Sequence, residues 1–478
     1  MGQARRRGTR DERIDNLRGA FGVVPMMRQR FEVYVSWTRS PIAGFVTQEL
    51  ECFSDVAETV LGALALDNTD RDFGFVTLGR DEKGRFRCID VGVDFEVKSN
   101  ARIALFKSIK ANSDSGLKMF AQGDADKSGI DLFVPIVPED KQHQSFKVVS
   151  SLLNHSPARA VLSEMMRHFV DVDGNFVQQF QSGGFDARIW ELYLYAYFLE
   201  ERLFTERPTP APDYCVSRGY EKVFIEAVTV NATAGEEILP IAGAKPQFRS
   251  GEEVAEILKG KMPIKFGSAL FSKLNRKTPY WSLQNVANNP FVLAIADFHE
   301  PQSMTWSSPA LFQYLYGVSH DFHHDEHGRL VISTLNVETH EYNGKTIPSG
   351  FFYLPNAENI SAVLFTASGT IAKFDRIGRY AGFGAKNLKI LRYGLCHDDD
   401  PNASLPKRFV FDVEPGAKVE TWGEGLSMFH NPNALHPVSP DLFPSIAHHW
   451  FEDGDIRSVL PEFHPYSSMT MNIHIRDE

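Results

Sequence analysis

Residues 185–299 limit the possible folds of this chain more than any other stretch. An aromatic helical run, FDARIWELYLYAYFLEERLF, precedes the strand-like runs DYCVS and KVFIEAVTVN, a basic helical run and the apolar run PFVLAIAD. Three acids, Glu191, Asp213 and Glu226, lie inside or beside these apolar segments. A buried carboxylate is costly unless a cation or a metal ion compensates it. The three acids therefore predict either ion pairs or a metal site in the core.

The composition indicates a folded protein of several domains. A length of 478 residues favours two to four domains, and 43% hydrophobic with 12% aromatic residues is typical of packed cores. No apolar run approaches the roughly 18 residues that span a bilayer, and no secretory segment is recognisable. The four cysteines lack CxxC spacing, which predicts neither disulfides nor a zinc site. We therefore expect a cytoplasmic protein with no membrane partner.

The alternation of strand-like and helix-like runs predicts an α/β fold of the α+β multidomain type. A small N-terminal α+β module is expected from FEVYVSW, ETVLGALAL, FGFVTLGR and FRCIDVGVDF and from a helix over 99–112. A β-rich C-terminal region is expected from runs such as LVISTLNV, GFFYLP, ISAVLFTASG and RFVFDVEP. The predicted regions are the N-terminal module 1–115, a linker 116–150, the core 151–305 and the C-terminal region 306–478.

Strand periodicity brings two of the acids together. In KVFIEAVTV, Glu226 shares one face with Val228, and Asp213 opens the preceding strand of the same expected hairpin. Both carboxylates could then hold one Mg²⁺ (or Mn²⁺), which prefers hard oxygen ligands. Glu191 lies near the buried face of its helix, where two interpretations carry equal weight. It either pairs with Arg188 or another base, or serves as a functional carboxylate.

The order of these residues resembles that of the PD-(D/E)xK, or restriction-endonuclease-like, nuclease superfamily. The matching residues are Glu191 on a helix, Pro212-Asp213 at a strand and Glu226 in an apolar strand, over about residues 185–300. The resemblance implies a central restriction-endonuclease-like mixed sheet flanked by helices. It also implies a metal-dependent endonuclease that hydrolyses DNA phosphodiester bonds, with the three acids as metal ligands and Glu191 also as a candidate catalytic residue. By analogy, such an enzyme would act in defence against foreign DNA.

The sequence departs from the pattern of this superfamily at one place. The lysine expected two residues after the glutamate is absent, because Val228 stands there. Helical spacing over residues 264–277 offers a replacement, with Lys273 as the first candidate and Lys277 as the second. We expect Lys273 to orient the attacking water or to neutralise the phosphate.

A run of basic residues without an intervening acid favours a phosphate-containing ligand near this helix. The net charge of −11 argues against non-specific coating of nucleic acid, but it allows a local basic groove. A solvated helix face explains the run equally well. The residues expected to contact nucleic acid, most simply DNA, are Lys259, Lys261, Lys265 and Arg276.

Two other interpretations stay open. A catalytically degenerate nuclease fold would bind nucleic acid or a protein partner without cleavage, as the missing lysine suggests. The histidines of HDFHHDEHG could belong to an enzyme of another class, although solvated residues at a hairpin tip explain them better. The flanking regions are expected to offer surfaces to a second copy of the chain or to another protein.

Overall fold

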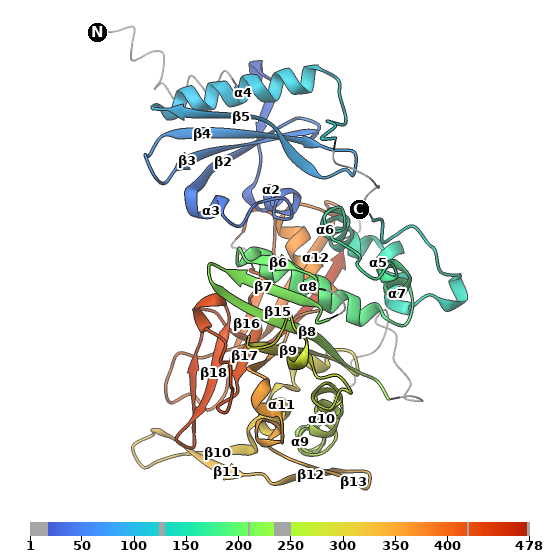
Figure 1. The fold of residues 1–478 in the computed structure, drawn as a ribbon, viewed down its shortest axis with the longest axis vertical. Coiled ribbons are helices and arrows are strands. Elements are labelled where there is room, and N and C mark those ends of the chain that lie inside the picture. Colours follow the sequence, from blue (N-terminus) through green and yellow to red (C-terminus); the bar gives the residue numbers. More distant parts are fainter. Residues whose placement is uncertain (1–17, 124–129, 209–210, 234–249, 418–419, 476–478) are drawn as a thin grey trace.

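The molecule has the mixed α+β multidomain class predicted from the sequence (Figure 1). A small module with its own sheet adjoins a larger body built around an eight-stranded sheet. The parts of the chain that the computed structural model describes are residues 18–123, 130–208, 211–233, 250–417 and 420–475.

An antiparallel five-stranded sheet forms the N-terminal module, in the order β1-β2-β3-β4-β5. Helix α4 (Lys98–Asp114) covers one face, where Leu105 and Phe106 are wholly buried. The β4–β5 turn contains Gly84 at a φ of 76°, a conformation that glycine adopts without strain. The strands are β1 (Val23–Pro25), β2 (Thr47–Asp55), β3 (Val60–Asp67), β4 (Phe73–Arg80) and β5 (Phe86–Phe95).

The other face of this sheet is covered by a helix where the sequence predicts a strand. FEVYVSW contributes most of α2 (Arg28–Val35), with Phe31, Tyr34 and Val35 on its buried side. These positions repeat at i, i+3 and i+4, which is the spacing of one helix face. The same run also alternates between apolar and polar residues as a strand does, so its sequence is compatible with both structures. Because this face of the sheet is apolar, burial against residues such as Phe86 decides in favour of the helix. The prediction of a strand here is wrong.

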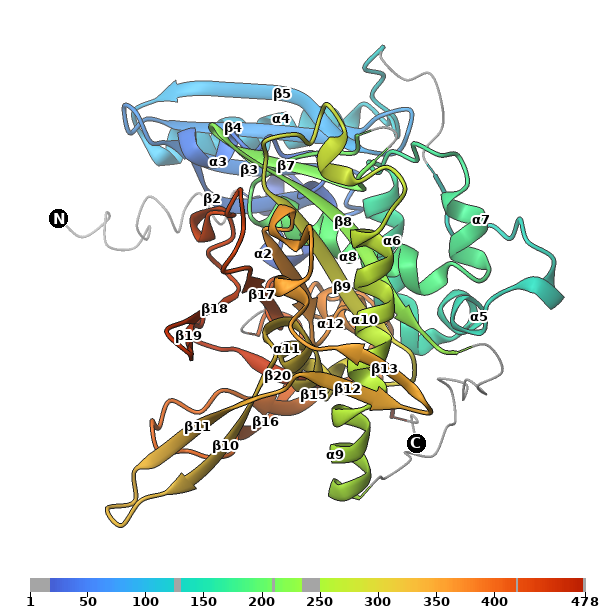
Figure 2. The ribbon, with the colours of Figure 1, turned by 60° about the horizontal axis from the view of Figure 1, so that its bottom comes forward.

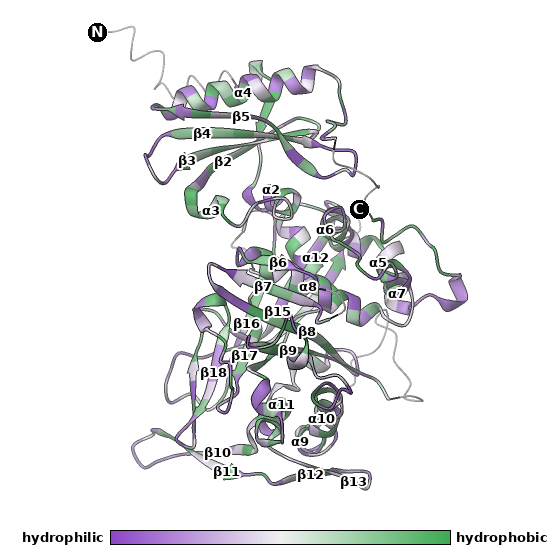
Figure 3. Ribbon diagram, in the orientation of Figure 1, coloured by the Kyte–Doolittle hydropathy of each residue, from purple (hydrophilic) through white to green (hydrophobic). Residues whose placement is uncertain are grey.

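The eight-stranded sheet has the order β19-β18-β17-β14-β9-β8-β7-β6. Strands β6, β7 and β8 run antiparallel, whereas β8, β9 and β14 run parallel to one another. Hydrophobic residues gather on its central strands (Figure 3), as expected where helices cover both faces. The strands are β6 (Phe204–Glu206), β7 (Tyr214–Arg218), β8 (Glu221–Asn231), β9 (Phe291–Phe298), β14 (Ala362–Thr366), β17 (Leu426–His430), β18 (Ala447–Glu452) and β19 (Asp455–Val459).

Helices α8 (Phe185–Glu200) and α10 (Lys261–Leu274) cover opposite faces of β8 and β9. On the α8 face, Trp190 donates a hydrogen bond from Nε1 to the carbonyl oxygen of Ala294 in β9, at 2.9 Å. On the α10 face, Phe266 and its neighbours form a second apolar cluster. Seven of the eight residues of β9 are buried, which confirms the fully buried strand predicted for PFVLAIAD.

The large sheet contains strands from both sides of residue 305, where the sequence predicts that the core ends. β14 and its neighbours β17, β18 and β19 come from the C-terminal region but complete the sheet beyond β9. The physical reason is that a buried strand such as β9 needs a hydrogen-bonded neighbour on each side. Inside the predicted linker, α5 (Gln144–Ser151) packs Phe146 and Val149 into the main core. Neither boundary therefore separates an independent core.

The remaining elements surround the large sheet. Two hairpins extend from the core beside α11 (Figure 2). The histidines of HDFHHDEHG are exposed on the first hairpin, in agreement with the solvated positions predicted for them. GFFYLP, predicted to be a strand, instead contains a short 3-10 turn.

Among the described residues, no helix has both the length and the apolar character needed to cross a membrane. The elements are α3 (Ala43–Val46), α6 (Ser156–Met166), α7 (Phe176–Gln181), α9 (Gly251–Lys259), α11 (Ser308–Tyr316), β10 (Val318–His324), β11 (Leu330–Asn336), β12 (Thr339–Tyr342), β13 (Lys345–Pro348), α12 (Ile371–Tyr380), β15 (Leu388–Cys396), β16 (Lys407–Val413) and β20 (Pro465–His474).

Candidate functional site

The β7–β8 hairpin brings Asp213 and Glu226 together near one edge of the large sheet. Tyr214 pairs with Ile225 in the antiparallel ladder, so Asp213, one residue earlier, comes opposite Glu226. Asp213 Oδ2 accepts a hydrogen bond from the backbone N–H of Ala227 at 2.8 Å. This bond fixes the carboxylate against β8. The two acids that strand periodicity pairs are therefore neighbours in the fold.

Of the three acids, Asp213 has the most informative pKa shift. Burial, together with the neighbouring carboxylates of Glu226 and Glu191, raises the pKa of Asp213 to about 7. The Ala227 hydrogen bond and the charge of Arg207 act in the opposite direction. Carboxylates that repel one another in a buried setting are typical of sites that bind a cation or exchange a proton.

Glu226 is held by two donors from the α10 side. Lys273 Nζ lies 2.8 Å from Glu226 Oε1, and the Tyr280 hydroxyl donates to the same oxygen at 2.6 Å. The Tyr280 ring stacks on Phe291, and the Arg276 guanidinium lies 4.4 Å from the ring centroid. Among the described residues, both bonds to this carboxylate end on Oε1, so Oε2 is left for another ligand. Lys273 thus reaches the acid pair. The role predicted for it, orienting the attacking water or neutralising the phosphate, stays a prediction.

Glu191 is compensated by two arginines. Its Oε1 accepts from Arg188 at 2.6 Å and its Oε2 accepts from Arg207 at 2.8 Å. Burial nevertheless raises the pKa of Glu191, against the effect of both cations. This is the ion-paired interpretation that the sequence left open. Its role as a metal ligand stays a prediction, because it would require at least one of these pairs to break.

The basic run predicted to contact nucleic acid is divided along α9, α10 and the residues just after α10. Lys273 contacts Glu226 and Arg276 lies over the Tyr280 ring, whereas Lys265 donates to Asn231 O and Thr233 Oγ1 at the far end of β8. Lys261 is roughly 18 Å from Lys273 along the helix. Lys259 and Lys277 are exposed: Lys259 lines a cavity of about 690 Å³ with Glu253 and Glu256, and Lys277 forms no ion pair within the described residues.

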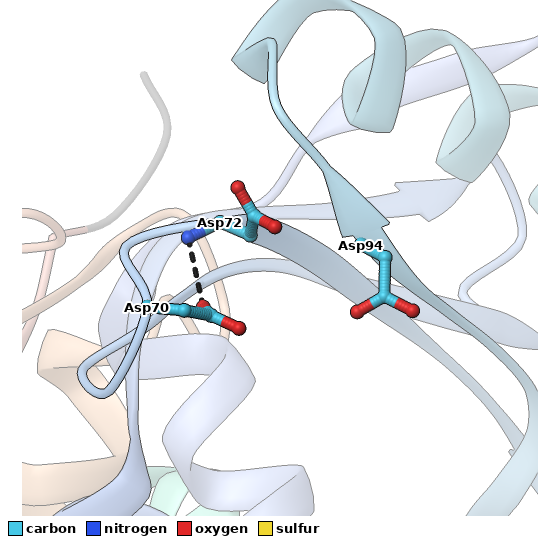
Figure 4. A group of neighbouring side chains, drawn as sticks. All are labelled: Asp70, Asp72 and Asp94. Carbon is cyan, nitrogen blue, oxygen red and sulfur yellow. Dashed lines mark hydrogen bonds between the residues drawn. The ribbon is translucent and has the colours of Figure 1, made fainter.

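A separate acidic group lies on the N-terminal module. Asp70, Asp72 and Asp94 offer carboxylate oxygens within 4.8 Å of one another, and the backbone N–H of Asp72 donates to Asp70 (Figure 4). Across the part of the chain that the structure describes, no other three His, Cys, Asp or Glu residues meet this distance. The group is largely exposed, and such groups are common on surfaces without an ion. Glu191, Asp213 and Glu226, the three predicted metal ligands, therefore do not form such a group in this structure, although Asp213 and Glu226 are neighbours in the β7–β8 hairpin.

Sequence reasoning missed two features. Arg207 was not considered, although it joins Glu191 to the Asp213 side of the site and lies over the Phe169 ring, 4.6 Å from its centroid. An arginine next to prolines gives no sequence signal of such a role. The second feature is a buried charge network around Glu420, whose members are too far apart in the sequence to form a motif.

Comparisons with known proteins give no further information. No protein-family model, no curated protein and no solved structure matches this chain. The functional argument therefore depends on the geometry described above.

Replacing Asp213 with asparagine is expected to stabilise the protein at pH 8 by roughly 2 kcal/mol. The pKa of Asp213 is raised to about 7 in the folded state, above the unfolded value near 3.9. The folded state therefore holds this proton more tightly, and stability falls as the pH rises from about 4 to about 7. Asparagine removes this loss. Urea unfolding at pH 5 and pH 8 should show the larger gain at pH 8; an equal gain at both would contradict the assignment.

Proposed function

We propose that this protein is a metal-dependent nuclease that hydrolyses DNA phosphodiester bonds at Asp213 and Glu226. The observation that carries the proposal is the contact of Lys273 Nζ with Glu226 Oε1 at 2.8 Å, opposite the Asp213 side chain. A helix lysine thus stands beside the acid pair, although Val228 occupies the usual lysine position.

The arrangement of elements supports the same proposal. The helix with Glu191, the strand pair with Asp213 and Glu226, the helix with Lys273 and the buried strand β9 follow one another in the chain. This is the order that the resemblance to PD-(D/E)xK nucleases implies. Strand β9 lies parallel beside β8, and the helices cover opposite faces, so the acids sit between two layers.

The donor set fits a hard divalent cation. Asp213 and Glu226 would supply oxygen ligands. Burial, together with repulsion from Glu226 and Glu191, raises the pKa of Asp213, and a bound cation would relieve that repulsion. Mg²⁺ or Mn²⁺ held by these two residues would neutralise negative charge on the phosphate. Glu191 would support the pair from a distance, because each of its oxygens accepts from an arginine.

The side chains around the acid pair have separable roles. The Lys273 side chain is 29% exposed, so its ammonium group can reach a phosphate in the solvent-facing part of the site. The Tyr280 hydroxyl is buried and orients the Glu226 carboxylate. Arg207 offsets the negative charge of Glu191 and Asp213, which limits the repulsion inside the site.

A catalytically degenerate protein that binds nucleic acid is the second candidate. The observation in its favour is that the acids already have partners in this state: Glu191 pairs with two arginines, and Glu226 with Lys273 and Tyr280. A network that is complete without a metal could be purely structural. Binding without cleavage would be its signature.

Purified protein is expected to cleave plasmid and linear DNA in the presence of Mg²⁺ or Mn²⁺, and not in the presence of EDTA.

Lys273→Ala should lower the cleavage rate on the order of a hundredfold, because a cation beside the reacting phosphate is lost. Lys273→Arg should recover part of the rate, and Lys277→Ala decides between the two lysines. Lys107→Ala, at an exposed position on α4, is the control. DNA binding without cleavage under any of these metals would replace this proposal with the second candidate.

A further inference from the structure

The three-stranded sheet, whose strand order is β16-β15-β20, has an open edge at β16. All seven residues of β16 pair with β15, and among the described residues no strand pairs with the other side of β16. The opposite outer strand, β20, contacts η3 (Leu153–His155) and η5 (Ser303–Thr305). An unpaired edge presents a row of backbone N–H and C=O groups, which another strand can bind. The edge at β16 is therefore a candidate interaction surface.

The side chains of β16 show that this edge is accessible. Val410, at the centre of the strand, is 68% exposed, and Phe411 is 42% exposed. Arg408 and Asp412 are exposed as well, whereas Phe409 is buried on the other face of the sheet. Proteins often protect a free edge with a proline or a bulge. Strand β16 contains no proline, and its pairing with β15 has no bulge.

The charges of β16 are arranged symmetrically about Val410. Side chains alternate along a strand, so Arg408, Val410 and Asp412 share one face of the sheet. If two copies of β16 pair antiparallel about a two-fold axis at Val410, Arg408 of each chain lies opposite Asp412 of the other. The same register places Phe409 opposite Phe411 on the other face. All seven residues of the strand are paired in it.

Both charged residues are available for a partner. Arg408 forms no ion pair among the residues that the structure describes. Asp412 Oδ1 lies 3.2 Å from Lys389 Nζ, but these side chains are 58% and 41% exposed, and such surface pairs contribute little to stability. Opposite charges directly across antiparallel strands stabilise the pairing, whereas like charges destabilise it. Two symmetric pairs of Arg408 with Asp412 therefore favour this register.

The free edge of β5 in the N-terminal module is protected where β16 is not. Asp90 and Asp94 lie at equal distances from Gly92, so two copies of β5 paired about Gly92 would bring carboxylates opposite each other. The register of β5 with β4 also shifts twice along the strand. Strand β16 has neither protection.

We infer that β16 pairs with β16 of a second copy of this chain, which joins the two three-stranded sheets into one sheet. The partner is a second copy because the charge pattern complements itself: a single strand supplies both members of each ion pair. The inference does not depend on the proposed function, since β16 contributes no residue to the pair of Asp213 with Glu226.

Sedimentation velocity of the wild-type protein should show a monomer at ~1 µM and a dimer at ~200 µM, because an interface built on one strand pair is small and binds weakly. Arg408→Asp should weaken self-association by roughly tenfold, because carboxylates then face each other at both ends of the strand pair. Asp412→Arg should have the same effect, because guanidinium groups then face each other. Arg457→Asp is the matched control: Arg457 is 70% exposed on β19, the outer strand of the large sheet, and this variant should associate as wild type.

Mixing the two single variants tests the register itself. In an equimolar mixture, the acid introduced at position 408 of one chain faces the base introduced at position 412 of the other. The native Asp412 and Arg408 face each other at the second position. The mixture should therefore recover wild-type dimerisation, although each variant alone is largely monomeric. A chain that carries both substitutions should also dimerise.

The outcomes of these measurements do not involve cleavage, so they are separate from the test of the nuclease. A wild-type protein that stays monomeric at ~200 µM would overturn the inference. Dimers that keep wild-type affinity in both single variants would overturn it as well, because the contact would then lie elsewhere on the molecule. A mixture that fails to dimerise, with both variants folded by circular dichroism, would exclude the antiparallel pairing about Val410.

Discussion

Glu226→Gln is expected to lower Mg²⁺-dependent cleavage on the order of a thousandfold. The amide keeps the size of the side chain and can still accept hydrogen bonds from Lys273 and Tyr280. It no longer carries the negative charge that would share a divalent cation with Asp213, and one carboxylate alone is a poor site for Mg²⁺. Cleavage rates over a Mg²⁺ titration measure the effect directly.

A thermal measurement checks the same substitution without using activity. Mg²⁺ bound only by the folded state should raise the Tm of the wild-type protein in a concentration-dependent way, and this rise should disappear in Glu226→Gln. Glu221→Gln is the matched control, because Glu221 lies on the same strand but is exposed. Undiminished cleavage by the Glu226 variant would move the chemistry elsewhere and leave these contacts as structural.

The acid pair was predictable from the sequence because its geometry is local. Alternation along KVFIEAVTV fixes the face of Glu226. The short turn at Gly219 and Tyr220 makes β7 the neighbour of β8, which brings Asp213 opposite Glu226. The contact of Lys273 was also accessible, because α10 shows its apolar stripe in the sequence and must lie on β8. Each step needed only periodicity and chain connectivity.

The partners of Glu191 could not be assigned in the same way. Arg188, three residues away on the same helix, was one open choice, but Arg207 arrives on a segment between α8 and β7 that has no periodic pattern. Whether a buried acid pairs with a base or with a metal depends on tertiary placement, which spacing does not encode. The strand predicted at FEVYVSW failed for a related reason, since burial of Phe31 and Tyr34 under the sheet decided the conformation.

A buried network of charged residues in the C-terminal region was even less predictable from residue spacing in the sequence. Glu420 is wholly buried and lies 2.7 Å from Lys373 Nζ, 2.5 Å from Arg376 Nε and 3.3 Å from Arg392 Nη2. Lys373 and Arg376 belong to α12 and Arg392 to β15, so one carboxylate joins a helix to a three-stranded sheet with the order β16-β15-β20. Arg376 opens the run RIGRYAGFGAKN, and its side chain is wholly buried in this network.

Glu420→Gln is therefore expected to destabilise the protein by about 3–5 kcal/mol, the largest stability effect anticipated for a single neutral-amide substitution in this chain. Glutamine leaves Lys373, Arg376 and Arg392 with too little negative charge in a place that water does not reach. Urea unfolding followed by circular dichroism measures the loss. The three cations hold the pKa of Glu420 well below its usual range. Its contribution is thus complete at neutral pH and declines as the medium is acidified.

Two further variants distinguish charge imbalance from general damage to the core. Glu414→Gln is the control, because the Glu414 side chain is 48% exposed and 3.9 Å from Arg379, so less than about 0.5 kcal/mol should be lost. Lys373→Met combined with Glu420→Gln removes one cation together with the anion and should recover part of the stability. Equal destabilisation by the single and double variants would show that packing, and not charge, is what Glu420 supplies.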